Sequence, residues 1–152
     1  MDVYLVRHAE AVDETRALRD PMRYLTSHGR AQAQALGERL RWHDCEPTHV
    51  WASPLVRAVQ TAELVTAALG GVTPVEIAPE LAPDAPARAL IAALPAEGSV
   101  LLVGHEPSLS AIGALLVGGD LAALAKAEAV RICDGALRWR FRWDAPAPDT
   151  TP

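Results

Sequence analysis

Short apolar runs alternate with longer helical patterns along most of this chain, and this alternation limits the folds that it can adopt. The runs have the length and β-branched content of buried strands, and polar or turn residues bound them. They cover residues 3–6, 50–52, 75–77 and 100–103. Strands that alternate with helices form right-handed crossovers, so we predict an α/β fold with three layers, α/β/α, and a mainly parallel central sheet.

Helical patterns fill the segments between these runs. The first covers about residues 27–41, and the second follows Ser53-Pro54, which we interpret as an N-cap and a first helical residue. The second helix ends at Gly70. Two shorter helices are predicted over residues 86–94 and 107–116. The predicted inward side chains of the first two helices are Ala33, Leu36, Gly37 and Leu40, and Leu55, Val59, Ala62, Val65 and Leu69.

The pattern changes near the C-terminus. Runs at residues 129–132 and 136–143 flank Asp134-Gly135, a turn signal that is typical of β-hairpins. We therefore predict an antiparallel ribbon at the edge of the sheet, with one buried face. The predicted buried side chains are Leu137, Trp139, Phe141 and Trp143, and the predicted solvated ones are Arg138, Arg140 and Arg142.

The length of 152 residues predicts a single domain, which we assign to residues 1–144. Residues 145–152 hold three prolines and no large apolar side chain, so we predict a disordered tail there. Residues 11–25 form a long polar loop after the first strand. Loops of this length in a compact domain are often functional.

Composition excludes several classes of protein. With 14 Lys and Arg against 19 Asp and Glu, the formal charge is -5, so we expect neither nucleic acid nor an anionic membrane to be held by bulk charge. The two cysteines, Cys45 and Cys133, are too few for a disulfide scaffold or a four-ligand zinc site, and we interpret them as reduced thiols. The chain shows no apolar run of membrane-spanning length and no basic leader, so we expect a cytoplasmic protein.

Charged and titratable side chains follow three of the predicted strands. Arg7-His8 follows the first, Arg57 lies shortly after the second, and His105 follows the fourth. Ligands of open α/β sheets bind beyond the carboxyl ends of the strands, so we expect these groups to meet at one place. Arginine offers flat bidentate donors, and the first turn of a helix favours an anion. The sequence therefore predicts a site for a phosphoryl group.

Several motifs, in this order, resemble the histidine phosphatase superfamily. The resemblance extends over about residues 1–143, and the short chain without a large inserted cap is similar to the SixA-like phosphohistidine phosphatase branch, which has a phosphoglycerate mutase-like fold. The motifs are Arg7-His8-Ala9-Glu10, Leu25-Thr26-Ser27-His28-Gly29, Ser53-Pro54 with Arg57, Gln60-Thr61-Ala62, Gly104-His105 and Pro79-Glu80-Leu81-Ala82-Pro83.

The resemblance implies a hydrolase that needs no metal and no cofactor. His8 is expected to be the nucleophile that carries the phosphoryl group as a covalent intermediate. Arg7 and Arg57 are expected to hold the nonbridging oxygens, and a protonated His105 to stabilise the charge of the transition state. Arg23 resembles an arginine at the mouth of the site in relatives, although a solvated loop charge is an equal interpretation.

The general acid of many superfamily members has no clear counterpart, because its position aligns near Pro83. Asp84 is a weak candidate for it. Phosphohistidine has an imidazole leaving group that needs little acid assistance. We therefore expect a phosphorylated protein as the substrate, and a monomer is compatible with the sequence.

Three other functions remain open on the sequence alone. One is a small-molecule phosphomonoesterase or mutase of the same superfamily, and another is a noncatalytic phosphate-binding module. The third is a metal hydrolase that uses Asp13, Glu106 or Asp120 beside the histidines, although no HxH, HxD or HExxH spacing is present.

Overall fold

The computed structural model describes residues 1–147 and contains a six-stranded sheet in the order β3-β2-β4-β1-β5-β6. The first four strands are parallel, whereas β5 and β6 are antiparallel at one edge. This arrangement confirms the predicted mainly parallel sheet with its C-terminal ribbon. The strands are β1 (Asp2–Arg7), β2 (His49–Ala52), β3 (Val75–Ile77), β4 (Ser99–Gly104), β5 (Glu128–Cys133) and β6 (Ala136–Arg142).

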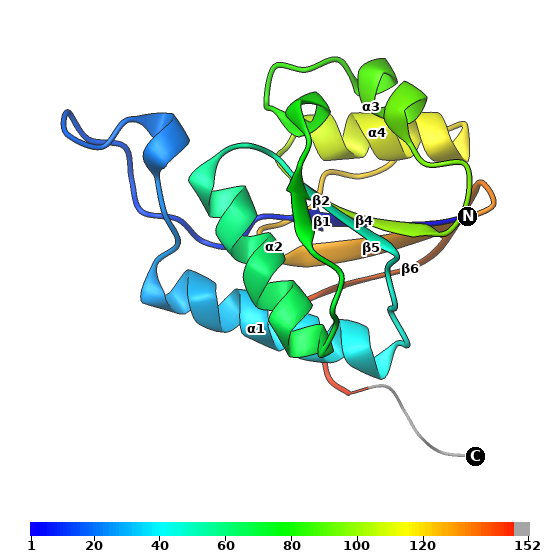
Figure 1. Cartoon of the computed structure of the whole chain (residues 1–152), viewed down its shortest axis with the longest axis horizontal. Helices are drawn as coiled ribbons and strands as arrows, with labels where there is room; N and C mark the ends of the chain where they lie inside the picture. Colours follow the sequence, from blue (N-terminus) through cyan, green and yellow to red (C-terminus); the bar gives the residue numbers. More distant parts are fainter. Residues whose placement is uncertain (148–152) are drawn as a thin grey trace.

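Helices cover both faces of the sheet, which confirms the three predicted layers (Figure 1). One face carries α1 (Ser27–Trp42) and α2 (Val56–Leu69), and the other carries α3 (Ala87–Ala93) and α4 (Ser108–Val117). Two short 3₁₀ turns, η1 (Asp20–Met22) and η2 (Pro79–Leu81), lie in the connections.

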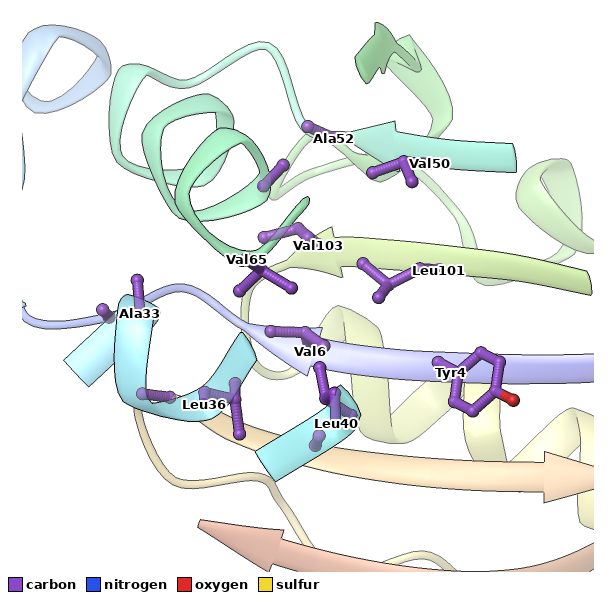
Figure 2. Close-up of a cluster of buried hydrophobic side chains, with 14 of the residues drawn as sticks. Tyr4, Val6, Ala33, Leu36, Leu40, Val50, Ala52, Val65, Leu101 and Val103 are labelled. Carbon is purple, nitrogen blue, oxygen red and sulfur yellow. The ribbon is translucent and has the colours of Figure 1, made fainter. Parts of the chain in front are cut away.

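Each face of the sheet buries its own apolar cluster. Figure 2 shows the cluster beneath α1 and α2, where Leu36, Leu40 and Val65 pack against Val6 and Val103 of the central strands. These five side chains are shielded completely from solvent. Burying side chains of this size stabilises the fold by about 1.5–3 kcal/mol each. The rigid sheet fixes where its carboxyl ends lie.

The N-terminus of α1 is built against the loop that follows β1. Thr26 caps the helix, because its hydroxyl accepts a hydrogen bond from the Gly29 amide at 2.9 Å. A side chain at Gly29 would place a Cβ 2.0 Å from the Glu10 carbonyl oxygen, so only glycine allows this approach. The helix therefore braces the segment that carries Arg7 and His8.

The predicted start of α2 is wrong by two residues. Leu55, and not Ser53, is the N-cap, so Pro54 is not a helical residue. Ser53 instead continues β2, since its amide donates to the Val103 carbonyl at 3.0 Å. The predicted end is confirmed, because Gly70 adopts the left-handed conformation with a φ of 69°.

The C-terminal ribbon differs from the prediction in two side chains. A β-bulge pairs Leu137 with Ile132 and Trp139 with Arg131, which leaves Arg138 without a partner and turns Leu137 to the face opposite Trp139 and Phe141. Leu137 is consequently exposed. Arg140 is not simply solvated either, because its Nη2 pairs with the nearly buried Glu128 carboxylate at 3.0 Å.

Part of the predicted tail is attached to the domain. The Ala145 carbonyl accepts a hydrogen bond from Nε of Arg39 at 2.6 Å. Residues 148–152, the rest of that prediction, lie outside the described residues.

Candidate active site

A cavity of about 300 Å³ opens at the carboxyl ends of β1 and β4. The structure brings all four residues of the predicted phosphoryl site to it, although they come from three separate segments of the chain. Its lining residues are Arg7, His8, Asp20, Arg23, Arg57, Pro83, His105, Glu106 and Lys126.

Strand register places the two histidines side by side. Arg7 pairs with Gly104 in the parallel β1–β4 ladder, so the residues that follow, His8 and His105, leave adjacent strands at the same level. The His8 amide donates to the Gly104 carbonyl at 3.1 Å, and the ring centroids lie 5.1 Å apart. This arrangement follows directly from the parallel sheet.

His8 is held as a neutral imidazole with one nitrogen unprotonated. Its Nδ1 lies 2.8 Å from the Ala9 carbonyl oxygen, which can only accept a hydrogen bond, so Nδ1 carries the proton. Burial lowers the pKa of His8 to about 3, and the charges of Arg57 and Arg7 act in the same direction. At neutral pH, Nε2 therefore offers a lone pair.

The position of His8 is supported from α2. Thr61 donates its hydroxyl proton to the Arg57 carbonyl at 2.8 Å and accepts the Ala9 amide at 3.1 Å. Because Thr61 is completely buried, it has no competing water, and it connects the end of β1 to the first turn of α2. The nucleophile candidate and an arginine candidate are thus fixed relative to each other.

His105 is oriented by Ser53, the residue predicted as the N-cap of the second helix. The Ser53 hydroxyl lies 2.7 Å from Nε2 of His105, and both side chains are buried. Nδ1 of His105 is buried without a hydrogen-bond partner. Burial, followed by the charge of Arg57, lowers the pKa of His105 to about 4. Without an anion in the cavity, this ring is therefore neutral at pH 7.

Arg7 and Arg57 are held by backbone carbonyl groups, and each has N–H donors without a partner. Nη1 of Arg7 donates to the Leu124 carbonyl, and Nη1 of Arg57 donates to the Asp20 carbonyl, both at 2.9 Å. The Nε atom of each arginine is buried without a partner. Unpaired buried donors are costly, which makes this cavity attractive to an anion. Arg57 also lies in the first turn of α2, where the helix dipole favours negative charge.

Asp20 is a site residue that sequence reasoning missed. Its carboxylate pairs with Nη1 of Arg23 at 2.9 Å and with Nη2 of Arg57 at 3.3 Å. The hydrogen bond from Arg23 is the main cause of a lowered pKa at Asp20, so the carboxylate stays ionised. The long polar loop was a signal for this region, but no motif distinguished Asp20 from the other acidic residues in it.

The remaining candidates fall in different places. Arg23 lines the cavity, with its Nε atom donating to the Val12 carbonyl at 2.6 Å. Asp84 is exposed and is not a lining residue, whereas the neighbouring Pro83 is. Glu106 lines the cavity, but its carboxylate accepts both the amide and the hydroxyl of Ser110.

Two kinds of feature are absent from the described residues. Within residues 1–147, no three His, Cys, Asp or Glu side chains are grouped closely enough to hold a metal ion. No helix in the same part of the chain is both long and apolar enough to span a membrane.

Comparison with known proteins identifies the family. The family model described as histidine phosphatase superfamily (branch 1) matches residues 3–82. An uncharacterized protein of Picosynechococcus sp. is 31% identical over 152 residues, which cover 95% of this chain and 92% of that protein. Phosphohistidine phosphatase SixA of Escherichia coli (strain K12) is 33% identical over 125 residues, covering 79% of this chain and 76% of SixA.

Solved structures agree with the sequence matches. The structure of the protein histidine phosphatase SixA complexed with tungstate superposes with a TM-score of 0.86 at 26% identity, covering 94% of this chain and 97% of that one. The chain therefore belongs to branch 1 of the histidine phosphatase superfamily, and it is a SixA-like phosphatase, a hydrolase of phosphate groups.

Proposed function

We propose that this phosphatase acts through a phosphohistidine intermediate on His8 and that its substrate is phosphohistidine on a protein. The observation that carries the mechanism is the hydrogen bond from Nδ1 of His8 to the Ala9 carbonyl. This bond leaves the lone pair on Nε2 of a ring whose low pKa keeps it neutral. Such an imidazole is a nucleophile without any prior proton transfer.

The reaction then has two displacements. In the first, the Nε2 lone pair of His8 forms a bond to phosphorus while the bond from phosphorus to the leaving group breaks, and that group departs with the electron pair. In the second, water attacks phosphorus and the bond to Nε2 breaks. Inorganic phosphate is released, the proton from water goes to phosphate or solvent, and neutral His8 is restored. One difficult displacement becomes two easier ones.

Three buried nitrogens without a partner would donate to the phosphoryl oxygens in both steps, the one on His105 once its ring is protonated. They are Nε of Arg7, Nε of Arg57 and Nδ1 of His105. A bound dianion would raise the pKa of His105, because the attraction opposes the burial that now lowers it. Preorganised donors of this kind stabilise the transition state without reorganisation during the reaction.

The residues that line the cavity favour a leaving group that needs no strong general acid. Pro83 lines the cavity near the position where the acid aligns, and the exposed Asp84 does not line it. An imidazole leaves phosphorus more readily than an alkoxide does, because it departs as a neutral or protonated ring. The relative from Escherichia coli, a phosphohistidine phosphatase by name, gives further support for this substrate. The free thiols Cys45 and Cys133 are compatible with a cytoplasmic site of action.

The runner-up is a small-molecule phosphomonoesterase, and the observation that favours it is Glu106. This carboxyl group lines the cavity and could protonate an alkoxide if it exchanged its hydrogen bonds to Ser110. The mechanism at His8 would be the same for both substrates.

A turnover panel tests the proposed substrate. Initial rates are compared for a phosphohistidine protein, a phosphohistidine peptide, an aryl phosphate and several sugar phosphates. We expect both phosphohistidine substrates to exceed the sugar phosphates in kcat/KM by about 10²-fold or more, the range that general acid catalysis supplies. Faster turnover of the sugar phosphates, together with its loss in Glu106→Gln, would overturn the proposal in favour of the phosphomonoesterase.

A further inference from the structure

Lys126 is the only lysine in a sequence whose other cationic side chains are all arginines. It lines the cavity that holds His8, yet its side chain is exposed, whereas His8, Arg57 and His105 are buried. Lys126 therefore lies at the mouth of the cavity, outside the groups that face the phosphoryl position.

The loop that carries Lys126 is fastened to the strand that carries His8. The amide of Ala127 donates to the carbonyl oxygens of Arg7 at 3.1 Å and His8 at 3.3 Å. The Leu124 carbonyl accepts Nη1 of Arg7 at 2.9 Å. The residues on both sides of Lys126 thus contact the backbone or side chain of the residues at the end of β1.

A second set of contacts fixes the same loop from behind. The Glu128 carboxylate accepts the Ala125 amide at 2.7 Å and pairs with Nη2 of Arg140 at 3.0 Å. Ala127 has a φ of 53°, a left-handed conformation that is energetically unfavourable for a non-glycine residue. The hydrogen bonds offset this cost, so the loop has a defined shape that presents Lys126 to the cavity.

The charge of Lys126 is not neutralised by neighbouring protein groups. Arg57 and Arg23 share the carboxylate of Asp20. The Glu106 carboxylate is engaged by Ser110. Among residues 1–147, Lys126 takes part in no ion pair. An uncompensated ammonium at the mouth of an anion-binding cavity attracts negative charge on whatever enters it.

We propose that Lys126 binds a carboxylate of the substrate that lies outside the phosphoryl group, so that the enzyme prefers acidic substrates. The inference depends on the proposed phosphatase mechanism in one respect: the phosphoryl group is bound by Arg7 and Arg57 inside the cavity. The flexible four-carbon side chain of lysine then reaches the part of the substrate that projects from the mouth. In a phosphohistidine protein this carboxylate belongs to an Asp or Glu near the phosphohistidine, and in a small molecule it belongs to the leaving group.

Matched pairs of ligands isolate the carboxylate. Phosphoglycerate and glycerol phosphate differ by one carboxylate, and two phosphohistidine peptides can differ by Glu against Gln beside the phosphohistidine. Binding of the small pair is measured as Kd in His8→Ala protein, where turnover does not intervene, and the peptide pair is measured as kcat and KM. We expect the acidic member of each pair to bind more tightly, about threefold to tenfold, with the preference decreasing as salt is added.

Four variants connect the preference to Lys126. Lys126→Gln should abolish it, Lys126→Arg should retain most of it, and Lys126→Glu should reverse it. Arg138→Gln, which removes an exposed arginine of β6 that is not a lining residue of the cavity, is the matched control and should keep the wild-type preference. Thermal unfolding of each variant confirms that the fold is intact.

Two results would overturn the inference. One is equal weakening of both members of a pair in Lys126→Gln, which would mean that Lys126 binds the phosphoryl group itself. The other is an unchanged preference in Lys126→Gln and Lys126→Glu. Neither result depends on the choice of substrate, because the Kd measurements stand even if no phosphohistidine peptide is hydrolysed, and failure of the peptides alone would count only against the proposed substrate.

Discussion

The two ends of α2 each border a cavity of about 300 Å³, but the two cavities differ in charge. At the N-terminus, Arg57 joins three other cationic side chains around the cavity that holds His8. At the C-terminus, Thr66 and Leu69 line a cavity where Glu46 is the single charged side chain among the described lining residues.

The comparison shows why cavity volume alone does not identify a phosphate site. The same helix directs its positive dipole end toward the first cavity and its negative end toward the second. Buried side-chain nitrogens without a hydrogen-bond partner are grouped at the first, on Arg7, Arg57 and His105. The second has one buried unpartnered polar atom, Oγ1 of Thr66. Within residues 1–147, only the first end has both the dipole and the side-chain donors that an anion requires.

The largest expected effect comes from removing the arginine at the N-terminal end. Arg57→Ala should lower kcat/KM by about 10²- to 10³-fold, the range for loss of a preorganised donor to the transition state. Arg57→Lys should recover only part of this loss, because an ammonium lacks the bidentate geometry. Steady-state kinetics on a phosphohistidine peptide measures both. Activity close to wild type in Arg57→Ala would show that the N-terminal cavity is not the phosphate site.

The next effect is on stability in acid. His8 and His105 have pKa values of about 3 and about 4 in the folded protein, below the ordinary value of 6.5. The unfolded chain binds more protons between these values, so stability from these groups is present above about pH 6.5 and is lost as the pH falls toward 4 and 3. Denaturant unfolding at several pH values should show this loss as a decrease in the free energy of unfolding. The slope of that free energy against pH should be smaller in His105→Gln.

His28→Gln is the control for that measurement, since it removes an exposed histidine away from the cavity. Equal slopes in His105→Gln and in His28→Gln would contradict the assignment of the acid sensitivity to the cavity.

A smaller effect is expected at Ser53, a positioning residue that acts through His105. Ser53→Ala removes the hydroxyl 2.7 Å from Nε2 of His105. It should lower kcat by about tenfold, a factor that corresponds to the net free energy of one hydrogen bond. If Ser53 had a merely structural role, Ser53→Ala would lower kcat further when it is combined with His105→Gln. If Ser53 acts by positioning His105, it would cause no further loss in that background. The double variant therefore discriminates the two, and full additivity would rule out positioning.

The smallest effect is expected at the opposite end of α2. Thr66→Val replaces a buried unpartnered hydroxyl by a methyl group of similar size, which should raise the free energy of unfolding by about 1 kcal/mol. Turnover should not change. A large loss of activity here would break the distinction between the two cavities.

Much of the fold is predictable because local patterns and packing agree. The helix stripes coincide with buried faces, and Gly70 ends α2 where a left-handed residue is required. Parallel strands joined by right-handed crossovers then leave little choice for the sheet, so the residues after β1 and β4 meet.

The wrong and missed predictions concern residues whose position depends on tertiary contacts or on an irregularity of the backbone. Ser53 has the composition of an N-cap, but its hydroxyl contacts His105, which lies 52 residues away in the sequence. Leu137 follows the alternation of the ribbon, but the bulge at Arg138 changes its face. Asp20 and Lys126 contribute to the cavity through loop conformations that no periodic pattern encodes. Such features depend on tertiary contacts rather than on local propensity.

The most direct test of the central claim is to trap the phosphorylated enzyme. Wild-type protein is mixed with a phosphohistidine peptide, quenched in alkali within one turnover and digested for mass spectrometry. We predict one phosphoryl group on the peptide that contains His8, stable to alkali and labile to acid, and its absence in His8→Ala, which should still bind inorganic phosphate. Wild-type turnover in His8→Ala, or a phosphoryl group found on another residue, would contradict the mechanism.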